Sequence, residues 1–457
     1  MGEPTDRRGR PELVRARKRL GMTQVEAAEA LLVTPTTVSR WERGTQEIRP
    51  VYRARMAAVF GVSAEQIERW LESTDPVDTE LWPWPDFTDM SIESTVKSAE
   101  KLWRSELDLQ RRHMLATLPF VPAAVDGWLS AWSYGAPAPS PAAQGSGRRV
   151  GLSDVRRIDE MRMTFSRIDH RYGGGVVRPA VVDYLNTTVA TLLRGSYDER
   201  VGAALMTAAA TLTAFAGWTA FDIGRQGLAQ HYYGQALKLA KTADDRLTGA
   251  YVLTRMTYQA IHLNQHAQAS LLARAAVESA RQADAPPRVL GMLLVRQAWA
   301  DAMTRPARSG DRHKVRQIES LLAEAERVYA KGESGRDPDW AASWDEPQFR
   351  GELSTVWELL GENARAADHI EHALRAFGPD RPRSVALTRL AAANAYLGMG
   401  ELDQAIDSAR TAIDEGSSVN STRLIDRVKR FDKRLRPYET SIHVREFRSY
   451  LEHKIAV

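Results

Sequence analysis

A run of polar side chains near the amino terminus has the composition of a nucleic-acid-binding surface. Hydroxyl and guanidinium groups hydrogen-bond base edges and phosphate oxygens. Thr34 is a good N-cap residue, and Pro35 follows it at the first helical position, where its missing N–H costs nothing. The side chains after the cap would lie at the amino-terminal end of a helix; they are Thr36, Thr37, Ser39 and Arg40.

Other residues have spacings that could bind metal or perform catalysis. His262 and His266, like His369 and His372, could each form half of a metal site, but neither pair has a third ligand at a fixed spacing. Asp339 and Asp345 lie in an acidic loop that contains two tryptophans, and we expect either a solvated loop or tryptophans that plug a repeat.

Catalysis is not expected from the remaining motifs. The triple glycine 173–175 lacks the lysine and the preceding strand of a P-loop, so a break between two helices is predicted. The chain has no cysteine, which excludes disulfides and zinc–thiolate sites and suits the cytoplasm. We therefore expect no enzyme, no cofactor and no metal.

Two short helices must position the polar run. Thr23 is a good N-cap, and Glu26 follows at capping-box spacing. Apolar residues then recur at helical spacing at Val25, Ala28 and Leu31. The second helix is predicted to begin at Pro35 and to end at Gly44. Two capped helices with so short a turn form a helix-turn-helix, whose second helix enters the DNA major groove.

Flanking helices complete a small domain over residues 1–72. Helices are expected over Pro11–Leu20, Val51–Phe60 and Ser63–Leu71, which makes five in all. Residues 10–72 resemble the XRE family of phage-repressor-like helix-turn-helix regulators. Leu32 stands where that family usually has glycine, so we expect either left-handed strain at this residue or a slightly different turn.

The resemblance implies roles for individual residues. It places Gln24 at a phosphate and base-edge contact, and it makes Arg17 and Glu42 a structural ion pair. The groove-facing positions implied are Pro35, Thr36, Thr37, Ser39 and Arg40, and the phosphate-gripping positions are Arg43, Thr45, Gln46 and Arg49. The N-cap Thr34 is counted with the DNA-binding residues.

The charge distribution agrees with DNA binding by this domain. The whole chain of 457 residues carries a net charge of +4. Residues 1–60 hold 12 Lys and Arg against 7 Asp and Glu, a balance of +5, and the remainder is nearly neutral. The excess positive charge therefore lies where a phosphate-binding surface is predicted.

Residues 73–150 are predicted to connect this domain to the rest. Ser91–Leu115 is expected to be one long helix, which packs within its own chain or forms a dimer interface. Residues 135–147, rich in Pro, Ala, Gly and Ser, are predicted to be a flexible linker. Arg111-Arg112 before an apolar run resembles an export signal, but its internal position and its prolines argue against membrane insertion.

Residues 151–457 are expected to be helical and repetitive. Small residues recur at repeat spacing, with one set each that includes Ala229, Ala269, Ala325, Ala366 and Ala405. The fifth set is the clearest, with the large residue Tyr396 followed by Gly400, Ala405 and Ala412. This pattern resembles tetratricopeptide repeats, with a degenerate third repeat and capping helices over Leu424–Leu435 and Ile442–His453. The fold class predicted is all-α: a helix-turn-helix domain and an α-solenoid.

In such a solenoid the first helix of each hairpin lines the inner face. That face would present an effector surface of aromatic and arginine side chains for a peptide, an anionic small molecule or a protein partner: Trp218, Phe221, Arg255, Tyr258, Arg296, Trp299 and Asn394.

The whole arrangement, including the segments 168–185 (IDHRYGGGVVRPAVVDYL) and 216–237 (AGWTAFDIGRQGLAQHYYGQAL), resembles bacterial XRE–tetratricopeptide regulators. The resemblance implies transcriptional control, often of development or secondary metabolism. We expect a homodimer that binds double-stranded DNA at an inverted repeat, with no membrane partner. The alternative is an interaction scaffold whose helix-turn-helix docks protein instead of DNA.

Overall fold

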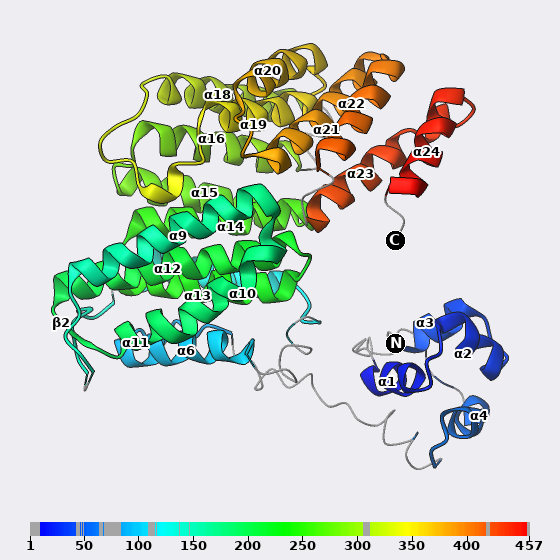
Figure 1. Ribbon diagram of the computed structural model, residues 1–457, viewed down its shortest axis with the longest axis horizontal. Coiled ribbons are helices and arrows are strands. Elements are labelled where there is room, and N and C mark those ends of the chain that lie inside the picture. Colours follow the sequence, from blue (N-terminus) through cyan, green and yellow to red (C-terminus); the bar gives the residue numbers. More distant parts are fainter. Residues whose placement is uncertain are drawn as a thin grey trace. The chain divides into compact units, whose positions relative to one another are not determined.

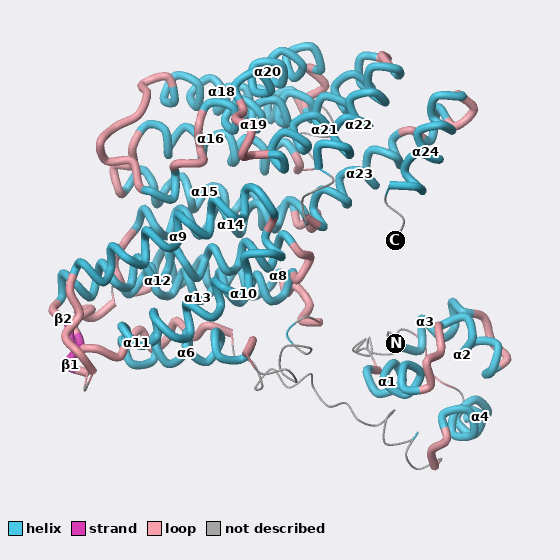
Figure 2. Tube along the Cα trace, viewed as in Figure 1, coloured by secondary structure: helices cyan, strands magenta, loops and turns pink. Residues whose placement is uncertain are grey.

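The computed structural model describes residues 10–42, 46, 48, 50–63, 67, 84–107, 115, 117–136, 138–145, 147–304, 311–416 and 421–454. It divides into two compact units, Met1–Pro83 and Trp84–Val457, each described here by itself. Helices make up nearly all of the regular structure (Figure 1). Within the described ranges the strands are β1 (Ala143–Gln144) and β2 (Ser196–Tyr197), which pair antiparallel at one end of the second unit (Figure 2).

The first unit contains the predicted pair of short helices. Thr23 caps α2 through a complete capping box with Glu26, and Thr34 Oγ1 accepts a hydrogen bond from the N–H of Thr37 at 3.2 Å. Leu32, between the two helices, has φ 52° and is left-handed, so the expected strain is present. The four described helices are α1 (Pro11–Arg19), α2 (Gln24–Leu31), α3 (Pro35–Glu42) and α4 (Pro50–Phe60).

The core of this unit lies under α2 and α3. Ala27, Ala28 and Leu31 are buried on α2, whereas Val25 is 52% exposed, so the prediction that Val25 belongs to the apolar stripe was wrong. From α3, Val38 and Trp41 enter the core. Of the predicted helix Ser63–Leu71, only Ser63 and Ile67 are described, and Ile67 is buried in the same core.

The second unit is built on five antiparallel helix hairpins. A left-handed residue, such as Gly224 or Gly400, ends the first helix of a hairpin and reverses the chain. The hairpins are α12 (Glu199–Asp222) with α13 (Gln226–Thr242), α14 (Arg246–His262) with α15 (His266–Gln282), α16 (Pro287–Ala302) with α18 (Arg312–Tyr329), α19 (Glu346–Leu359) with α20 (Asn363–Ala376), and α21 (Pro382–Met399) with α22 (Leu402–Gly416).

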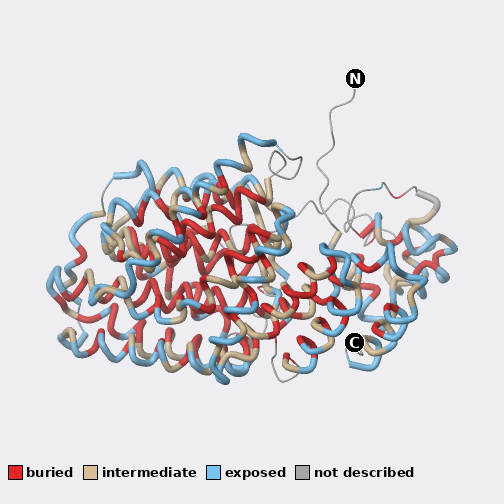
Figure 3. The backbone as a smooth tube through the Cα atoms, turned by 90° about the horizontal axis from the view of Figure 1, so that it is seen from above, coloured by how far each residue is buried: buried red, intermediate tan, exposed pale blue. Residues whose placement is uncertain are grey.

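The small residues predicted from the repeat pattern lie between these helices. Ala229, Ala269, Ala366 and Ala405 are all fully buried, as is Ala325 of the degenerate third repeat. The repeats are therefore confirmed as stacked hairpins. Their buried residues lie through the middle of the unit (Figure 3). By length and composition α12 could span a membrane, but 83% of its most apolar window is buried, which makes it a core helix.

The segment that precedes the repeats packs onto their second helices. α6 (Ile92–Ser105) lies against α13, and α8 (Pro122–Tyr134) lies against α15, where Trp132 Nε1 donates to Ser279 Oγ at 2.8 Å. The prediction of one helix over 91–115 was wrong, because α6 ends at Ser105. Its apolar stripe, including Val96 and Trp103, is buried within its own chain and is not available to a dimer partner.

The stretch 135–147 is also more ordered than a linker. Residues 143–144 form β1, and the carbonyl of Pro141 lies so close to Gly202 of α12 that a Cβ there would come within 2.0 Å of it. Within the stretch, a Cβ on Gly145 would come within 2.1 Å of the Arg194 carbonyl oxygen, so this small residue allows close packing.

Three further groups of elements complete the unit. The predicted break at the glycines lies between α9 (Leu152–Tyr172) and α10 (Gly174–Tyr184), where Gly173 has φ 90°. A π-helical turn, Leu185–Val189, and α11 (Ala190–Leu193) follow, and a short 3-10 turn, Asp339–Ala341, precedes α19. At the carboxyl end are α23 (Thr422–Arg434), a 3-10 turn over Arg436–Tyr438 and α24 (Ile442–Lys454).

Candidate DNA-binding surface and the cavity of the repeat unit

The polar face of α3 is turned to solvent. Val38 and Trp41 anchor the helix in the core, so the side chains on its other faces remain accessible. Of the five groove-facing positions predicted, Pro35, Thr36 and Arg40 are exposed, and Thr37 and Ser39 are half-buried. The N-cap Thr34 is exposed as well. This is the arrangement that a recognition helix needs.

A buried ion pair holds α1 against α3. Arg17 Nε donates to Glu42 Oε1 at 2.6 Å, and Arg17 Nη2 donates to Glu42 Oε2 at 3.2 Å. Gln24 Nε2 also donates to Glu42 Oε2, at 2.7 Å. The side-chain amide of Gln24 has two N–H groups, and Glu42 accepts a hydrogen bond from one of them.

Of the predicted phosphate-gripping positions, only Gln46 lies within the described residues. Gln46 is exposed, and its carbonyl accepts a hydrogen bond from Arg10 Nη1 at 2.8 Å. Arg43, Thr45 and Arg49 lie outside the described residues, as does Gly44 at the predicted helix end.

The second unit, which contains the repeats and is called the repeat unit from here on, encloses a cavity along the inner face of its hairpins. The first helices α12, α14, α16, α19 and α21 all contribute to its wall, and α9 and α23 close it. It has room for solvent of about 100 Å³, and it shares Ser166, His170, Ser343 and Arg381 with an open vestibule of about 490 Å³. The prediction that the first helices line the inner face is therefore correct.

Most of the predicted effector residues meet in this cavity. Trp218, Arg255, Tyr258, Arg296 and Trp299 all line it. Tyr258 lies edge-on between the two tryptophans, with ring centroids 6.0 Å from Trp218 and 5.1 Å from Trp299.

Two of the predicted effector residues do not line the cavity, and the charge of a third, Arg296, is compensated by a carboxylate. Phe221 is buried beside Trp218, and Asn394 accepts a hydrogen bond from Arg434 of α23 at 2.9 Å. Arg296 makes two 2.8 Å hydrogen bonds to the buried carboxylate of Glu352. Its charge is thus neutralised within the wall.

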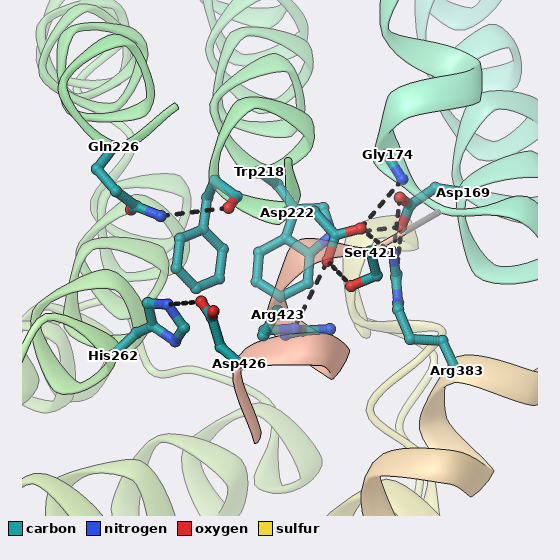
Figure 4. A network of polar contacts seen from close by, with 11 residues as sticks. Asp169, Gly174, Trp218, Asp222, Gln226, His262, Arg383, Ser421, Arg423 and Asp426 are labelled. Carbon is teal, nitrogen blue, oxygen red and sulfur yellow. Dashed lines mark hydrogen bonds and ion pairs between the residues drawn. The ribbon is translucent and has the colours of Figure 1, made fainter. Parts of the chain in front are cut away.

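A second buried network joins elements that are distant in sequence (Figure 4). Arg383 of α21 donates to Asp169 of α9, at 2.6 and 3.1 Å, and to Asp222 of α12 at 2.8 Å. Asp222 also accepts from Ser421 Oγ at 2.9 Å and from the N–H of Gly174 at 3.1 Å. The network fastens the first hairpin to the fifth and to the start of α23.

Electrostatics explain how this network tolerates burial. Burial opposes ionisation of Asp169, but the Arg383 guanidinium outweighs it and holds the pKa of Asp169 below its ordinary value. Burial likewise opposes the charge of Arg383, yet Asp169 and Asp222 raise its pKa above the ordinary value. The two carboxylates stabilise the charged form of Arg383, and Arg383 stabilises the charged form of Asp169.

Helix α23 lies on the inner face and is not merely an end cap. Leu424, Val428 and Phe431 recur along one side and are buried against α21 and α22. Arg423 and Arg427, on the other side, line the cavity. Further along the helix, Arg430 donates to the carbonyl of His262 at 3.0 Å, which places α23 against α14.

The histidine pairs do not form a metal site in the described part of the chain, which contains no cluster of three or more potential ligands. His262 Nε2 lies 3.3 Å from Asp426, and burial lowers the pKa of His262 to about 4, so it is neutral at physiological pH. Of the acidic loop, Asp345 caps α19, and Trp340 and Trp344 are buried beside Tyr251 of α14, in the second hairpin, so these tryptophans do not belong to a solvated loop.

Sequence reasoning missed Asp169, Asp222, Arg383, Arg423 and Arg427. The two α23 arginines carried a signal, because they share a four-residue spacing opposite an apolar stripe. No comparable signal links Arg383 to Asp169, 214 residues away.

Comparison with known proteins supports the assignment of the first unit as a helix-turn-helix domain. No curated protein matches the chain. Among solved structures it is similar to Bacillus thuringiensis PlcR in complex with the peptide PapR7 and DNA, at 13% identity and a TM-score of 0.26, over 70% of this chain and 93% of that one. A family model described as "Helix-turn-helix" matches residues 13–67. These residues therefore form a helix-turn-helix domain, with α2 and α3 as its two-helix motif.

Proposed function

We propose that this protein is a transcription regulator that binds specific duplex DNA through α3. The observation that carries the proposal is the capped, solvent-facing α3 in a domain matched by the helix-turn-helix model. The excess positive charge of residues 1–60 supports it, because phosphate neutralisation supplies much of the affinity for DNA. The second unit is proposed to receive the effector, since its inner face encloses a cavity lined by aromatic and arginine side chains.

Arg40→Ala tests the role of α3 in base recognition. If Arg40 reads a base edge, its loss should weaken binding to the cognate duplex by about 1–3 kcal/mol and relax preference at one base position. Fluorescence anisotropy with duplexes substituted one base at a time measures both effects. Arg156→Ala on α9, which removes the same charge from an exposed position in the other unit, is the control.

Equal weakening on every sequence would assign Arg40 to phosphate. Unchanged binding to all duplexes would contradict its place on the recognition surface. Failure of the wild-type protein to bind any duplex would favour a domain that docks protein.

We also propose that the regulator binds as a homodimer to an inverted repeat. One helix-turn-helix contacts a single half-site, and two half-sites about one helical turn (roughly 34–36 Å) apart add their contacts. Light scattering of the protein–DNA complex across a concentration series should give the mass of two chains per duplex. A complex with one chain at every concentration would rule the dimer out.

A further inference from the structure

The cavity of the repeat unit contains more positive than negative charge. Asp169 and Glu352 line it, Asp222 pairs with Arg383 from behind the wall, and Asp345 pairs with Arg381 from the side of the vestibule. Burial lowers the pKa of His170 to about 4, so this residue adds no charge. Six guanidinium groups thus face four carboxylates; the six belong to Arg255, Arg296, Arg381, Arg383, Arg423 and Arg427.

The uncompensated charge is localised. Arg383, Arg296 and Arg381 each pair closely with a carboxylate. Among the described residues, neither Arg255 nor Arg427 has a carboxylate within the 4.0 Å of an ion pair, and Arg423 shares Asp222 at 3.5 Å. The Nε atoms of Arg255 and Arg423 are buried without a hydrogen-bond acceptor. Buried donors of this kind are costly unless an acceptor satisfies them.

The same arginines lie over aromatic rings. The guanidinium carbons of Arg255 and Arg423 are 4.4 and 4.7 Å from the Trp218 ring centroid, and that of Arg427 is 5.9 Å from Trp299. Such stacking orients a guanidinium plane and leaves its N–H groups at the edge, where an oxyanion can accept them. The site therefore has fixed donors and apolar surface together.

We propose that this cavity binds the phosphate group of a small organic ligand, with Arg255, Arg423 and Arg427 as its charge partners. A phosphate carries close to two negative charges and matches the guanidinium fork. A space of about 100 Å³ accommodates the phosphate and a few further atoms, and the vestibule of about 490 Å³ can hold the remainder of the molecule. A folded partner does not fit. The inference rests on the proposal that the repeat unit is the effector unit.

Binding would also act on α23. Arg423 and Arg427 come from this helix, whereas Arg255 comes from α14, so a shared phosphate ties the two elements together. A ligand that binds the docked helix more tightly than an undocked one shifts the population toward the docked state.

Inorganic phosphate is the probe, and the full-length protein is used. Thermal unfolding in chloride buffer of matched ionic strength should show the repeat unit stabilised by roughly 3–8 °C at saturating phosphate. Titration calorimetry should give one site per chain. Arg427→Gln should abolish this stabilisation or weaken the apparent Kd by at least about tenfold. Without phosphate, this variant should be as stable as the wild type or more so, since a like charge has been removed.

Arg434→Gln on the same helix is the matched control, because Arg434 pairs with Glu358 outside the cavity and should leave phosphate binding intact. Arg255→Gln, on α14, tests the site from a second element and should reproduce the Arg427→Gln result. Stabilisation by the dicarboxylate succinate but not by phosphate would overturn the phosphate assignment. No stabilisation beyond chloride, or an unchanged response in both cavity variants, would overturn the site.

Binding of the wild-type protein to DNA is measured in parallel. A protein that binds specific DNA but no phosphate refutes this inference alone. A wild-type protein that binds phosphate but shows no specific DNA binding refutes the proposed function and leaves the phosphate site standing.

Discussion

Arg383→Leu should destabilise the repeat unit by about 3–5 kcal/mol at neutral pH. The substitution leaves the carboxylates of Asp169 and Asp222, 1% and 0% exposed, without their shared guanidinium. Breaking a buried pair by removing one partner leaves an uncompensated buried charge, which accounts for the size of the effect. Chemical denaturation followed by circular dichroism measures the loss.

The pH dependence identifies the cause. In the wild type the pKa of Asp169 lies below its ordinary 3.8, so its stabilisation is present above that value and is lost as pH falls through the folded-state pKa. In the variant, burial without Arg383 should raise that pKa above the ordinary value, so protonation relieves the buried charge. The stability difference between variant and wild type should therefore shrink on acidification.

Arg434→Leu, which breaks a partly exposed pair with Glu358, serves as the comparison and should cost no more than about 1 kcal/mol. Equal stability of Arg383→Leu and the wild type at neutral pH would contradict the role assigned to this network.

Trp41→Ala should unfold much of the first unit and abolish DNA binding. Trp41 is 1% exposed and packs against Tyr52 with ring centroids 5.0 Å apart. Truncating a buried tryptophan costs about 3–5 kcal/mol, which is a large part of the stability of so small a domain. Differential scanning calorimetry should show the transition of the first unit lost or lowered and that of the repeat unit unchanged.

Val25→Ala is the control within the same domain. Val25 is 52% exposed, so its truncation should change stability by no more than about 0.5 kcal/mol. A Trp41→Ala protein that keeps both its first-unit transition and its DNA binding would contradict the core placed beneath α3.

Local signals predicted the first unit well. Capping at Thr23 and Thr34, and the left-handed turn at Leu32, depend on neighbouring residues and were visible in the sequence. Val25 was misplaced because helical spacing alone does not say which of two adjacent stripes faces the core. The repeats were likewise predictable, because small residues such as Ala405 recur where two helices approach.

Long-range packing was not predictable in the same way. The composition of residues 135–147 is that of a linker, and only tertiary packing, such as that of Gly145 against the Arg194 carbonyl, shows why a small residue is needed there. The near balance of positive and negative residues after residue 60 also gives no sign of the cavity in which arginines from α14 and α23 lie together. Such clustering depends on the curvature of the solenoid, which no local pattern encodes.

Specific recognition of duplex DNA is the central claim, and a ratio of affinities tests it most directly. Duplexes are selected from a random pool with the full-length protein, and the Kd of the selected sequence is compared with that of a scrambled one at physiological salt. Specific binding should be at least about 10³-fold tighter than binding to the scrambled duplex. Equal affinity for the two duplexes, or no binding to either even at low salt, would contradict the account.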